Sequence, residues 1–383
     1  MNQFTASAVQ QQVKIYDSPL DYQVDIFKFL QMAQARRAKL VVFPALSPLM
    51  LIPPLAFRTR SNLLKKGKAG AERLSGLVGK LLDKAVTTAS QVKGGIQGDL
   101  LHLLEHYPGE IFDAYIDLFS AAALRYKMTL VAGSFYLREH EEGDCAHIAY
   151  VFSPNGMVLG RQKKIHLTPL EAKFCQPGDV LHAIETPVGR LGILINEDML
   201  YPECGRVLAA QGVEILVGLT AVPGRTPFRQ MRHAFLARVD ENEVVGVQSV
   251  LTGANLLQPG GPQLTGQAAL LLPFQLSPKG DGLLAEWQGT ETEGLIAERV
   301  DLDALKDYWI RPLPRLRQSM RMSTFSPLAG MYARRKTLDQ LYWNPADETT
   351  PMPRTAPTGD EPAASPAEGA LRSPFVEDNQ PEE

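Results

Sequence analysis

The stretch LGILINEDMLYPE, residues 191–203, decides how this chain is interpreted. Its first five residues are all apolar, as expected of a short strand that is covered on both faces. The strand stops abruptly at Asn196, and Pro202 follows where a helix can begin. A buried strand that turns sharply into a helix is a common place for a catalytic side chain. In this sequence an asparagine occupies that tip.

The whole chain has the composition of an ordinary globular protein. Its 383 residues leave room for one large α/β domain or two smaller ones, and an apolar fraction of 45% supports a sizeable core. The net charge of −3 argues against a general attraction to nucleic acid. No apolar run is long enough to cross a bilayer, and the first residues lack the basic start and apolar core of a signal peptide.

Three cysteines, Cys145, Cys175 and Cys204, make an odd number without the spacing of a metal site. This usage indicates reduced thiols and a cytoplasmic protein. No cofactor is predicted. His147 and His166 are interpreted as hydrogen-bonded structural histidines rather than metal ligands, because no second ligand lies at a useful spacing along the sequence.

Apolar runs typical of strands alternate with segments of helical spacing. Strands are predicted at 39–45, 128–136, 190–195, 213–221 and 244–251, with two more around the Pro-Asn-Gly turn within 146–160. Helices are predicted at 22–37, 111–122, 207–212 and 228–242. This alternation predicts an α/β layer fold whose strands are covered by helices.

Two segments depart from this pattern. Residues 57–93 hold nine Lys/Arg against two acids and an apolar stripe, which predicts a basic helical insertion over 57–95. Three roles stay open for it: packing on the domain, docking of the acidic tail, and contact with a membrane surface through 60–95. Residues 345–383 hold nine acids against two arginines and are predicted to be a disordered, Pro-rich tail. Residues 311–344 are predicted to form a C-terminal extension.

Five motifs follow one another in a recognisable order: VVFPA (41–45), RQKKIHL (161–167), EAKFCQPG (171–178), GILINEDMLYPE (192–203) and ARVDEN (237–242). In this order the chain resembles the nitrilase, or carbon-nitrogen hydrolase, superfamily. The resemblance implies a four-layer α-β-β-α sandwich over residues 1–310. It also implies a homodimer or a larger assembly.

The chemistry of that family, as the resemblance implies, uses a cysteine nucleophile, two glutamates and a lysine. The lysine falls on Lys164 and the second glutamate on Glu171. The first glutamate is replaced by Ala45, and the cysteine is replaced by Asn196. A carboxamide nitrogen is not nucleophilic because its lone pair is delocalised, so Asn196 cannot form the acyl intermediate.

The remaining candidates have supporting roles. Alternation along the strand places Lys164 inward and Lys163 outward. Asn196 is favoured as a turn-capping residue over a ligand-binding one. Asp198 and Glu241 are predicted to support the site, with an exposed helix end as an equal alternative for Glu241.

The leading hypothesis is a catalytically degenerate member of the family, a pseudoenzyme. It would bind a small amide- or carboxylate-bearing ligand through Lys164, or act as a scaffold or regulatory partner. The alternative is a working amidohydrolase that cleaves an amide or nitrile with another nucleophile. Cys204 lies eight residues past the tip, about two helical turns, and is not expected to reach it. Cys175 is expected nearer the pocket mouth, and neither thiol has a visible general base.

Overall fold

The computed structural model describes residues 3–57, 95–140 and 142–311. Almost all of the basic insertion predicted at 57–95 and of the extension predicted at 311–344 lies outside these residues, and so does the whole acidic tail at 345–383. The described residues all belong to one unit of the chain, Met1–Ser319.

The strands of the described residues form one continuous mixed sheet of thirteen strands. Their bounds are β1 (Gln3–Gln12), β2 (Ala38–Val42), β3 (Thr129–Val131), β4 (Phe135–Arg138), β5 (Cys145–Phe152), β6 (Val158–Lys163), β7 (Ile184–Thr186), β8 (Gly189–Ile195), β9 (Ile215–Thr220), β10 (Val245–Thr252), β11 (Ala269–Leu271), β12 (Leu283–Glu286) and β13 (Gly294–Asp301). Along the main path the order is β4-β5-β3-β2-β1-β10-β9-β8-β7.

The middle of this path, from β3 to β8, is parallel throughout. Because parallel strands point the same way, the carboxyl ends of β2, β8 and β9 meet at one edge of the sheet. That edge is where open α/β sheets bind their ligands. Ala45 and Asn196 follow β2 and β8 at this edge.

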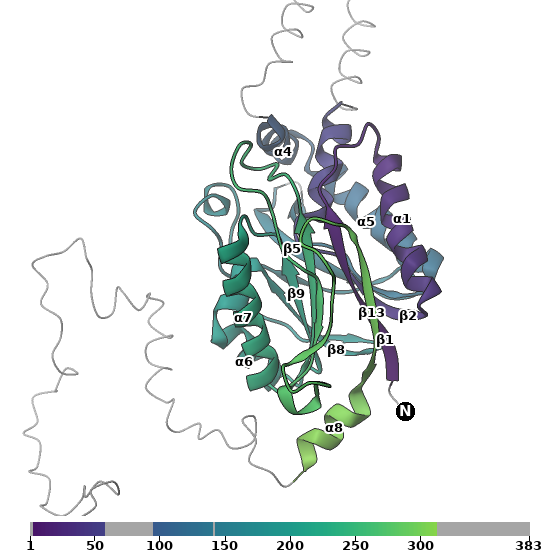
Figure 1. Ribbon diagram of the computed structural model, residues 1–383. Helices are drawn as coiled ribbons and strands as arrows, with labels where there is room; N and C mark the ends of the chain where they lie inside the picture. The colour runs from purple at the N-terminus through teal and green to yellow at the C-terminus, as the bar shows by residue number, and fades with distance from the viewer. Residues whose placement is uncertain (1–2, 58–94, 141, 312–383) are drawn as a thin grey trace, which may run out of the picture. The chain divides into compact units, whose positions relative to one another are not determined.

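Helices cover both sides of the sheet (Figure 1). Their bounds are α1 (Pro19–Ala35), α4 (Gly95–His106), α5 (Pro108–Tyr126), α6 (Pro202–Ala210), α7 (Arg225–Glu241) and α8 (Leu302–Ile310), with short 3-10 turns η1 (Ser47–Leu51), η2 (Glu171–Lys173), η3 (Asn196–Leu200) and η4 (Phe274–Leu276). In Figure 1, α1 and α5 lie on one side and α6 and α7 on the other. No helix of the described residues is long and apolar enough to cross a membrane.

Alternate side chains of one strand enter two different cores. On β8, Ile193 and Ile195 pack into the core that also holds residues of α1 and α5. Leu194, between them, packs into the core beneath α6 and α7. This period of two is the pattern expected of a strand buried on both faces.

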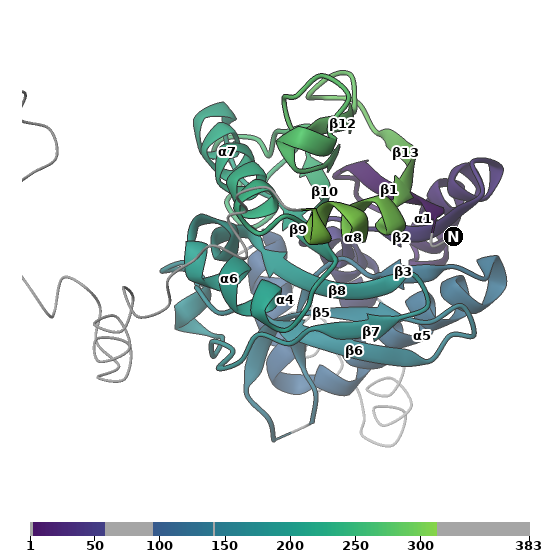
Figure 2. The ribbon, with the colours of Figure 1, turned by 90° about the horizontal axis from the view of Figure 1, so that it is seen from below.

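The sheet curls until its two ends meet. β6 and β7 run beside each other in Figure 2, and a Cβ added to Gly160 would lie 3.0 Å from the side chain of Ile184. The predicted α-β-β-α fold is therefore confirmed, and its two β layers are halves of one curled sheet.

The single strand predicted at 128–136 is wrong, because the structure has two strands there, β3 and β4. The break lies at Gly133, whose backbone passes so close to Pro44 that an added Cβ would be 2.1 Å from the Pro44 carbonyl oxygen. A regular strand cannot hold that approach, so the chain leaves the ladder for three residues.

Candidate active site

Asn196 forms the tip of a sharp turn directly after β8. Its φ of +46° lies in the left-handed region, where asparagine is tolerated better than most residues. The side chain is buried, and its Oδ1 accepts a 2.7 Å hydrogen bond from the backbone N–H of Ala221, just past β9. Asn196 therefore braces two parallel strands at the position where the resemblance expects a nucleophile.

Ala45 occupies the corresponding place after β2. It is fully buried, and its methyl group has no proton to exchange. The next residue, Leu46, has a φ of +58°, and its N–H donates to the carbonyl of Ser134 at 2.8 Å. The left-handed φ of Leu46 is a strained backbone conformation of the kind often found at functional turns. The Ala45 side chain beside it is chemically inert.

Lys164 and Glu171 lie together, as matched from the sequence. The Lys164 Nζ is 2.5 Å from Glu171 Oε2, and the lysine side chain is fully buried. Its neighbour Lys163 points outward, with 41% of its side chain exposed, and pairs with Glu139. The direction of both side chains follows the strand alternation.

Glu197 is a site residue that the sequence reasoning missed. Its Oε2 lies 2.5 Å from the Lys164 Nζ, on a side chain that is 28% exposed. Lys164 is thus held between two carboxylates, those of Glu171 and Glu197. The signal in the sequence that could have identified Glu197 was its position directly after Asn196, which was already matched to the family.

Glu171 is satisfied on both oxygens. Its Oε1 lies 2.7 Å from His147 Nδ1 and accepts from the Tyr136 hydroxyl, and its Oε2 accepts from the Thr168 N–H as well as meeting Lys164. A carboxylate only accepts, so the proton of His147 sits on Nδ1. Nε2 then accepts from the Ser134 hydroxyl at 2.8 Å.

The pKa values of this cluster agree with that arrangement. Burial opposes ionisation of Glu171, but the hydrogen bond from His147 and the charge of Lys164 outweigh it and hold its pKa well below the usual range. Burial lowers the pKa of His147 and keeps the ring neutral. Burial also opposes the charge of Lys164, but Glu197 and Glu171 outweigh it and raise the pKa of the lysine.

The two predicted supporting residues lie in different places. Asp198 accepts hydrogen bonds from the backbone N–H groups of Ile165 and His166, so it holds the segment that follows Lys164. Glu241 pairs with Arg238 at 2.8 Å, and its carbonyl accepts from Arg206. These two contacts of Glu241 belong to the packing of α7 on α6.

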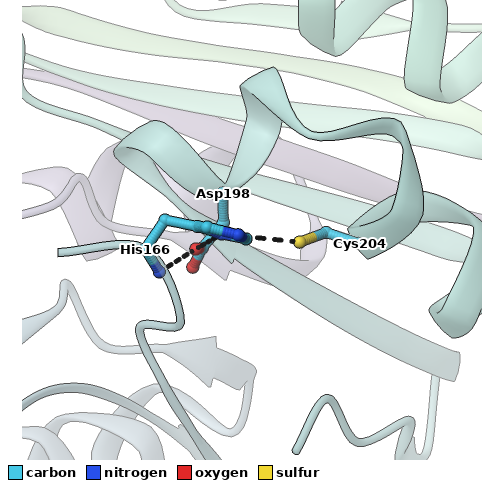
Figure 3. A group of neighbouring side chains, drawn as sticks. All are labelled: His166, Asp198 and Cys204. Atoms are coloured by element: carbon cyan, nitrogen blue, oxygen red, sulfur yellow. Dashed lines mark hydrogen bonds and ion pairs between the residues drawn. The ribbon is translucent and has the colours of Figure 1, made fainter. Parts of the chain in front are cut away.

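His166, Asp198 and Cys204 form a second cluster of polar side chains (Figure 3). Nδ1 of His166 lies 3.0 Å from Asp198 Oδ1 and 3.8 Å from Cys204 Sγ. The sequence offers His166 no second ligand at a useful spacing, and the fold brings Asp198 and Cys204 to it from other segments. Spacing within one segment says nothing of residues that a fold brings together.

This cluster is not a Cys-His-Asp catalytic relay. In such a relay the thiol and the carboxylate use opposite nitrogens of the ring. Here both approach Nδ1. Burial and the charge of Asp198 also raise the pKa of the Cys204 thiol to about 12, so it is not an activated nucleophile.

The other two cysteines face each other. Cys145, on β5, has its Sγ 3.1 Å from the Sγ of Cys175, which follows η2, and both residues are buried free thiols. The hydrogen bond between them and burial raise the pKa of Cys175 far above its ordinary value. Cys175 was expected near the pocket mouth, and the structure buries it.

The carbon-nitrogen hydrolase family model matches residues 5–254 of this chain. The chain belongs to the carbon-nitrogen hydrolase family. It is 30% identical over 200 residues to the probable hydrolase YhcX of Bacillus subtilis, covering 51% of this chain and 38% of that protein. It is 31% identical over 107 residues to the human omega-amidase NIT2, covering 26% of this chain and 38% of that protein. The chain thus spans less than half the length of these relatives.

Solved structures of carbon-nitrogen hydrolases share the fold. A Helicobacter pylori member matches with a TM-score of 0.60 at 19% identity, over 85% of this chain and 98% of that one. An amidase from Nesterenkonia sp. matches with a TM-score of 0.55 at 19% identity, over 79% of this chain and 92% of that one. At these identities the likeness establishes the fold of this carbon-nitrogen hydrolase family member.

The centre of this family member is closely packed. Lys164 is 1% exposed, Glu171 3% and Asn196 5%. Two cavities lined by described residues lie elsewhere, one near the carboxyl end of α1 and one between η1 and the loop at 254–257. Glu197 is the most exposed member of the Lys164 cluster and marks its side toward solvent.

Proposed function

We propose that this chain is a catalytically degenerate carbon-nitrogen hydrolase that acts by binding rather than by acyl transfer. The observation that carries the proposal is Asn196 at the elbow, with its carboxamide oxygen committed to the Ala221 N–H. Covalent catalysis needs an attacking atom with a free lone pair and a base to activate it. Ala45 leaves the matched base position without a titratable group.

A different thiol nucleophile would have to be one of the three cysteines. Cys145 and Cys175 are buried against each other, and Cys204 meets His166 through the nitrogen that Asp198 also uses. The raised pKa values of Cys175 and Cys204 keep both protonated at neutral pH. These contacts support a binding protein without hydrolytic activity over an amidohydrolase with another thiol nucleophile.

The ligand of the Lys164 cluster is a neutral amide group rather than a carboxylate. Lys164 already neutralises one of its two carboxylate partners, so an added anion would meet the excess negative charge of Glu197. An amide offers an N–H to the partly exposed Glu197 carboxylate, and a shift of Glu197 would open the buried Lys164 ammonium to the amide carbonyl oxygen. The partial exposure of Glu197 provides the access side.

The assembly and location are proposed by analogy. The chain forms a homodimer or larger assembly through its outer helices and functions in the cytoplasm. Large apolar side chains exposed on α1, Leu20 and Val24, and on α5, Leu124, support pairing on that side. Light scattering coupled to size-exclusion chromatography gives the mass directly, and a monomer at all concentrations contradicts the assembly.

Turnover and labelling test the loss of chemistry. A Glu→Gln variant of the Nesterenkonia amidase takes covalent addition from acrylamide and from fluoroacetamide at the active-site cysteine. With untagged wild-type chain, neither reagent is expected to add, and a panel of small amides and nitriles is expected to stay intact. Hydrolysis that disappears in a Cys145→Ala, Cys175→Ala or Cys204→Ala variant would overturn the proposal. Hydrolysis equal in all variants and removed by a different expression host identifies a contaminant.

Matched pairs of ligands test the binding site. Each small amide is compared with its carboxylic acid by the shift in melting temperature of the wild-type chain. The amide is expected to raise the midpoint and the acid is not. Glu197→Gln removes the excess negative charge and is expected to let the acid bind. Glu185→Gln, an exposed partner of Arg190, is the control and leaves both shifts unchanged. Equal shifts for acid and amide in the wild type contradict the charge argument.

A further inference from the structure

We propose that His166, Asp198 and Cys204 form a binding site for a zinc ion, independent of the amide site. The nitrogen, oxygen and sulfur atoms that face one another all lie within 4.8 Å. They come from three segments: the loop after β6, the turn η3, and the first turn of α6. Figure 3 shows the three side chains meeting from different directions.

The donor set selects the metal. Thiolate, imidazole and carboxylate together are the ligands of zinc in proteins, whereas calcium and magnesium prefer oxygen alone. Copper(I) and iron–sulfur clusters would need more sulfur than one cysteine supplies. Three protein ligands leave the fourth tetrahedral position for water.

The separations of the ring nitrogen from the oxygen and from the sulfur agree with tetrahedral coordination, and the carboxylate oxygen lies within 4.8 Å of the sulfur. Bond lengths of about 2.0 Å to nitrogen and oxygen and about 2.3 Å to sulfur place the nitrogen about 3.3 Å from the oxygen and about 3.5 Å from the sulfur. The structure has 3.0 Å and 3.8 Å for these two separations. Shifts of a few tenths of an ångström bring both to the ideal values.

The hydrogen bonding of the cluster also leaves a place for a cation. Both Asp198 Oδ1 and Cys204 Sγ approach the single Nδ1 of His166, and a neutral ring carries at most one proton there. If the Nδ1–H group donates its hydrogen bond to Asp198, the Cys204 sulfur can accept only a weak share of that hydrogen bond. Zinc in place of that proton bonds all three atoms: the ring becomes the tautomer with its one proton on Nε2, and the thiol proton leaves to solvent.

The ligands are already held in position. Backbone N–H groups of Ile165 and His166 donate to the Asp198 carboxylate and fix its orientation, as hydrogen-bond donors to metal ligands commonly do. The His166 ring stacks on Tyr201 with centroids 3.6 Å apart and planes 8° from parallel. The side chain of His166 is 31% exposed, which gives the ion a route from solvent to the buried Cys204 and Asp198.

The site adds a role for η3. This turn directs Glu197 to Lys164 and the next residue, Asp198, to the zinc ligands. Zinc would join the segment carrying Lys164 to the start of α6, and so restrain the elbow between them. Neither binding event requires the other, because their ligand residues are different.

Cobalt(II) is the probe, since a thiolate ligand gives it a charge-transfer band in the near ultraviolet. Untagged full chain is treated with a chelator, freed of it, and titrated with cobalt and then zinc. One equivalent of cobalt per chain is expected to develop the band, and zinc is expected to remove it. Cys204→Ala should abolish the band, and Cys175→Ala, the matched control, should keep it. His166→Ala should weaken binding by more than the roughly 10- to 100-fold cost of losing an outer-shell partner.

A wild-type chain without the band, or a band that survives Cys204→Ala, overturns the proposal. A second measurement on the wild type avoids reliance on variants that fold poorly. Alkylation with iodoacetamide under mild denaturant, mapped by mass, should be slowed by zinc at Cys204 and unchanged at Cys145 and Cys175. Equal protection of all three thiols, or of none, also overturns it.

Discussion

The two halves of the centre differ in what they keep. The half around Lys164 retains its charged side chains, and each one has partners: Glu171 and Glu197 on the lysine, and His147 on Glu171. The half at the ends of β2 and β8 has no charged side chain at the matched positions. Its turns at Leu46 and Asn196 are left-handed, and the side chains of Ala45 and Asn196 carry neither a nucleophile nor a base.

The difference follows from the cost of burial. A buried lysine without a carboxylate leaves an uncompensated charge. Replacing one residue of the ionic half therefore costs several kcal/mol of folding free energy. A thiol or a glutamate at the strand ends can be exchanged for a small or neutral group that packs or hydrogen-bonds. Glu197 provides the second carboxylate beside Lys164, whereas Ala45, which follows Phe43-Pro44, provides none.

Restoring the missing side chains is the strongest challenge to this comparison. Asn196→Cys combined with Ala45→Glu is expected to hydrolyse a small amide roughly 100- to 10,000-fold faster than Asn196→Cys alone, because a positioned base contributes that much. Ammonia release measures the rate, and melting curves confirm that both variants fold. Equal rates would mean that the retained backbone does not suffice to rebuild the site.

Removing Lys164 tests the ionic half. Lys164→Ala leaves Glu171 and Glu197 without their cation, and is expected to lower the free energy of unfolding by about 3–5 kcal/mol. Lys163→Ala, which removes a partly exposed partner of Glu139, should cost under about 1 kcal/mol. Urea denaturation measures both. Similar losses for the two lysines would remove the distinction between the halves.

Asn196→Ala tests whether the Asn196 side chain stabilises the half of the centre at the ends of β2 and β8. The substitution leaves the buried Ala221 N–H without its acceptor and is expected to cost about 1–3 kcal/mol. Asn255→Ala is the matched control, since Asn255 accepts from Leu257 in a half-exposed turn where water can replace it. Its cost should stay under about 1 kcal/mol, as is usual for surface positions. An Asn196→Ala chain as stable as the wild type would show that Asn196 does not brace the strands.

The smallest expected effect is a pH dependence from His147. Its pKa is lowered in the folded chain, so the unfolded chain takes up the proton first and stability falls as the pH drops below the ordinary value of 6.5. Glu171, whose pKa is lowered from 4.5, adds a further loss only below that pH. His147→Asn keeps a donor toward Glu171 and should flatten the decline between pH 7 and 5, by at most about 1.4 kcal/mol per pH unit.

His182→Asn, at an exposed histidine, is the control for that experiment and should leave the decline unchanged. Denaturation midpoints at pH 7, 6 and 5 measure it. A decline that is identical in the wild type and in His147→Asn would place the acid sensitivity outside the Lys164 cluster.

Much of the fold was predictable from local patterns. The apolar run before Asn196, the turn after Phe152 and the helical spacing within α1 and α5 are all present near the expected residues. Period and turn chemistry are local properties, so the sequence alone reveals them. The strands β1, β7 and β11 to β13 were not predicted. β1 pairs with β13 from the other end of the described residues, and residues of β11 pair with residues of β10 more than twenty positions before them, so these partners are not visible locally. β7 forms a local hairpin with β8, but its three residues are too few to show a strand period.

The sequence by itself supplied the prediction that Lys164 and Glu171 stand at the family's positions and that Ala45 and Asn196 replace two of its catalytic residues. Only the tertiary structure decided what those residues touch. Glu197 joined Lys164, and His166 met Asp198 and Cys204, through the turn η3 that ends β8. Hydrogen bonds and ion pairs act over about 3–4 Å, and which side chains come that close is set by the packing of distant segments rather than by their spacing along the chain.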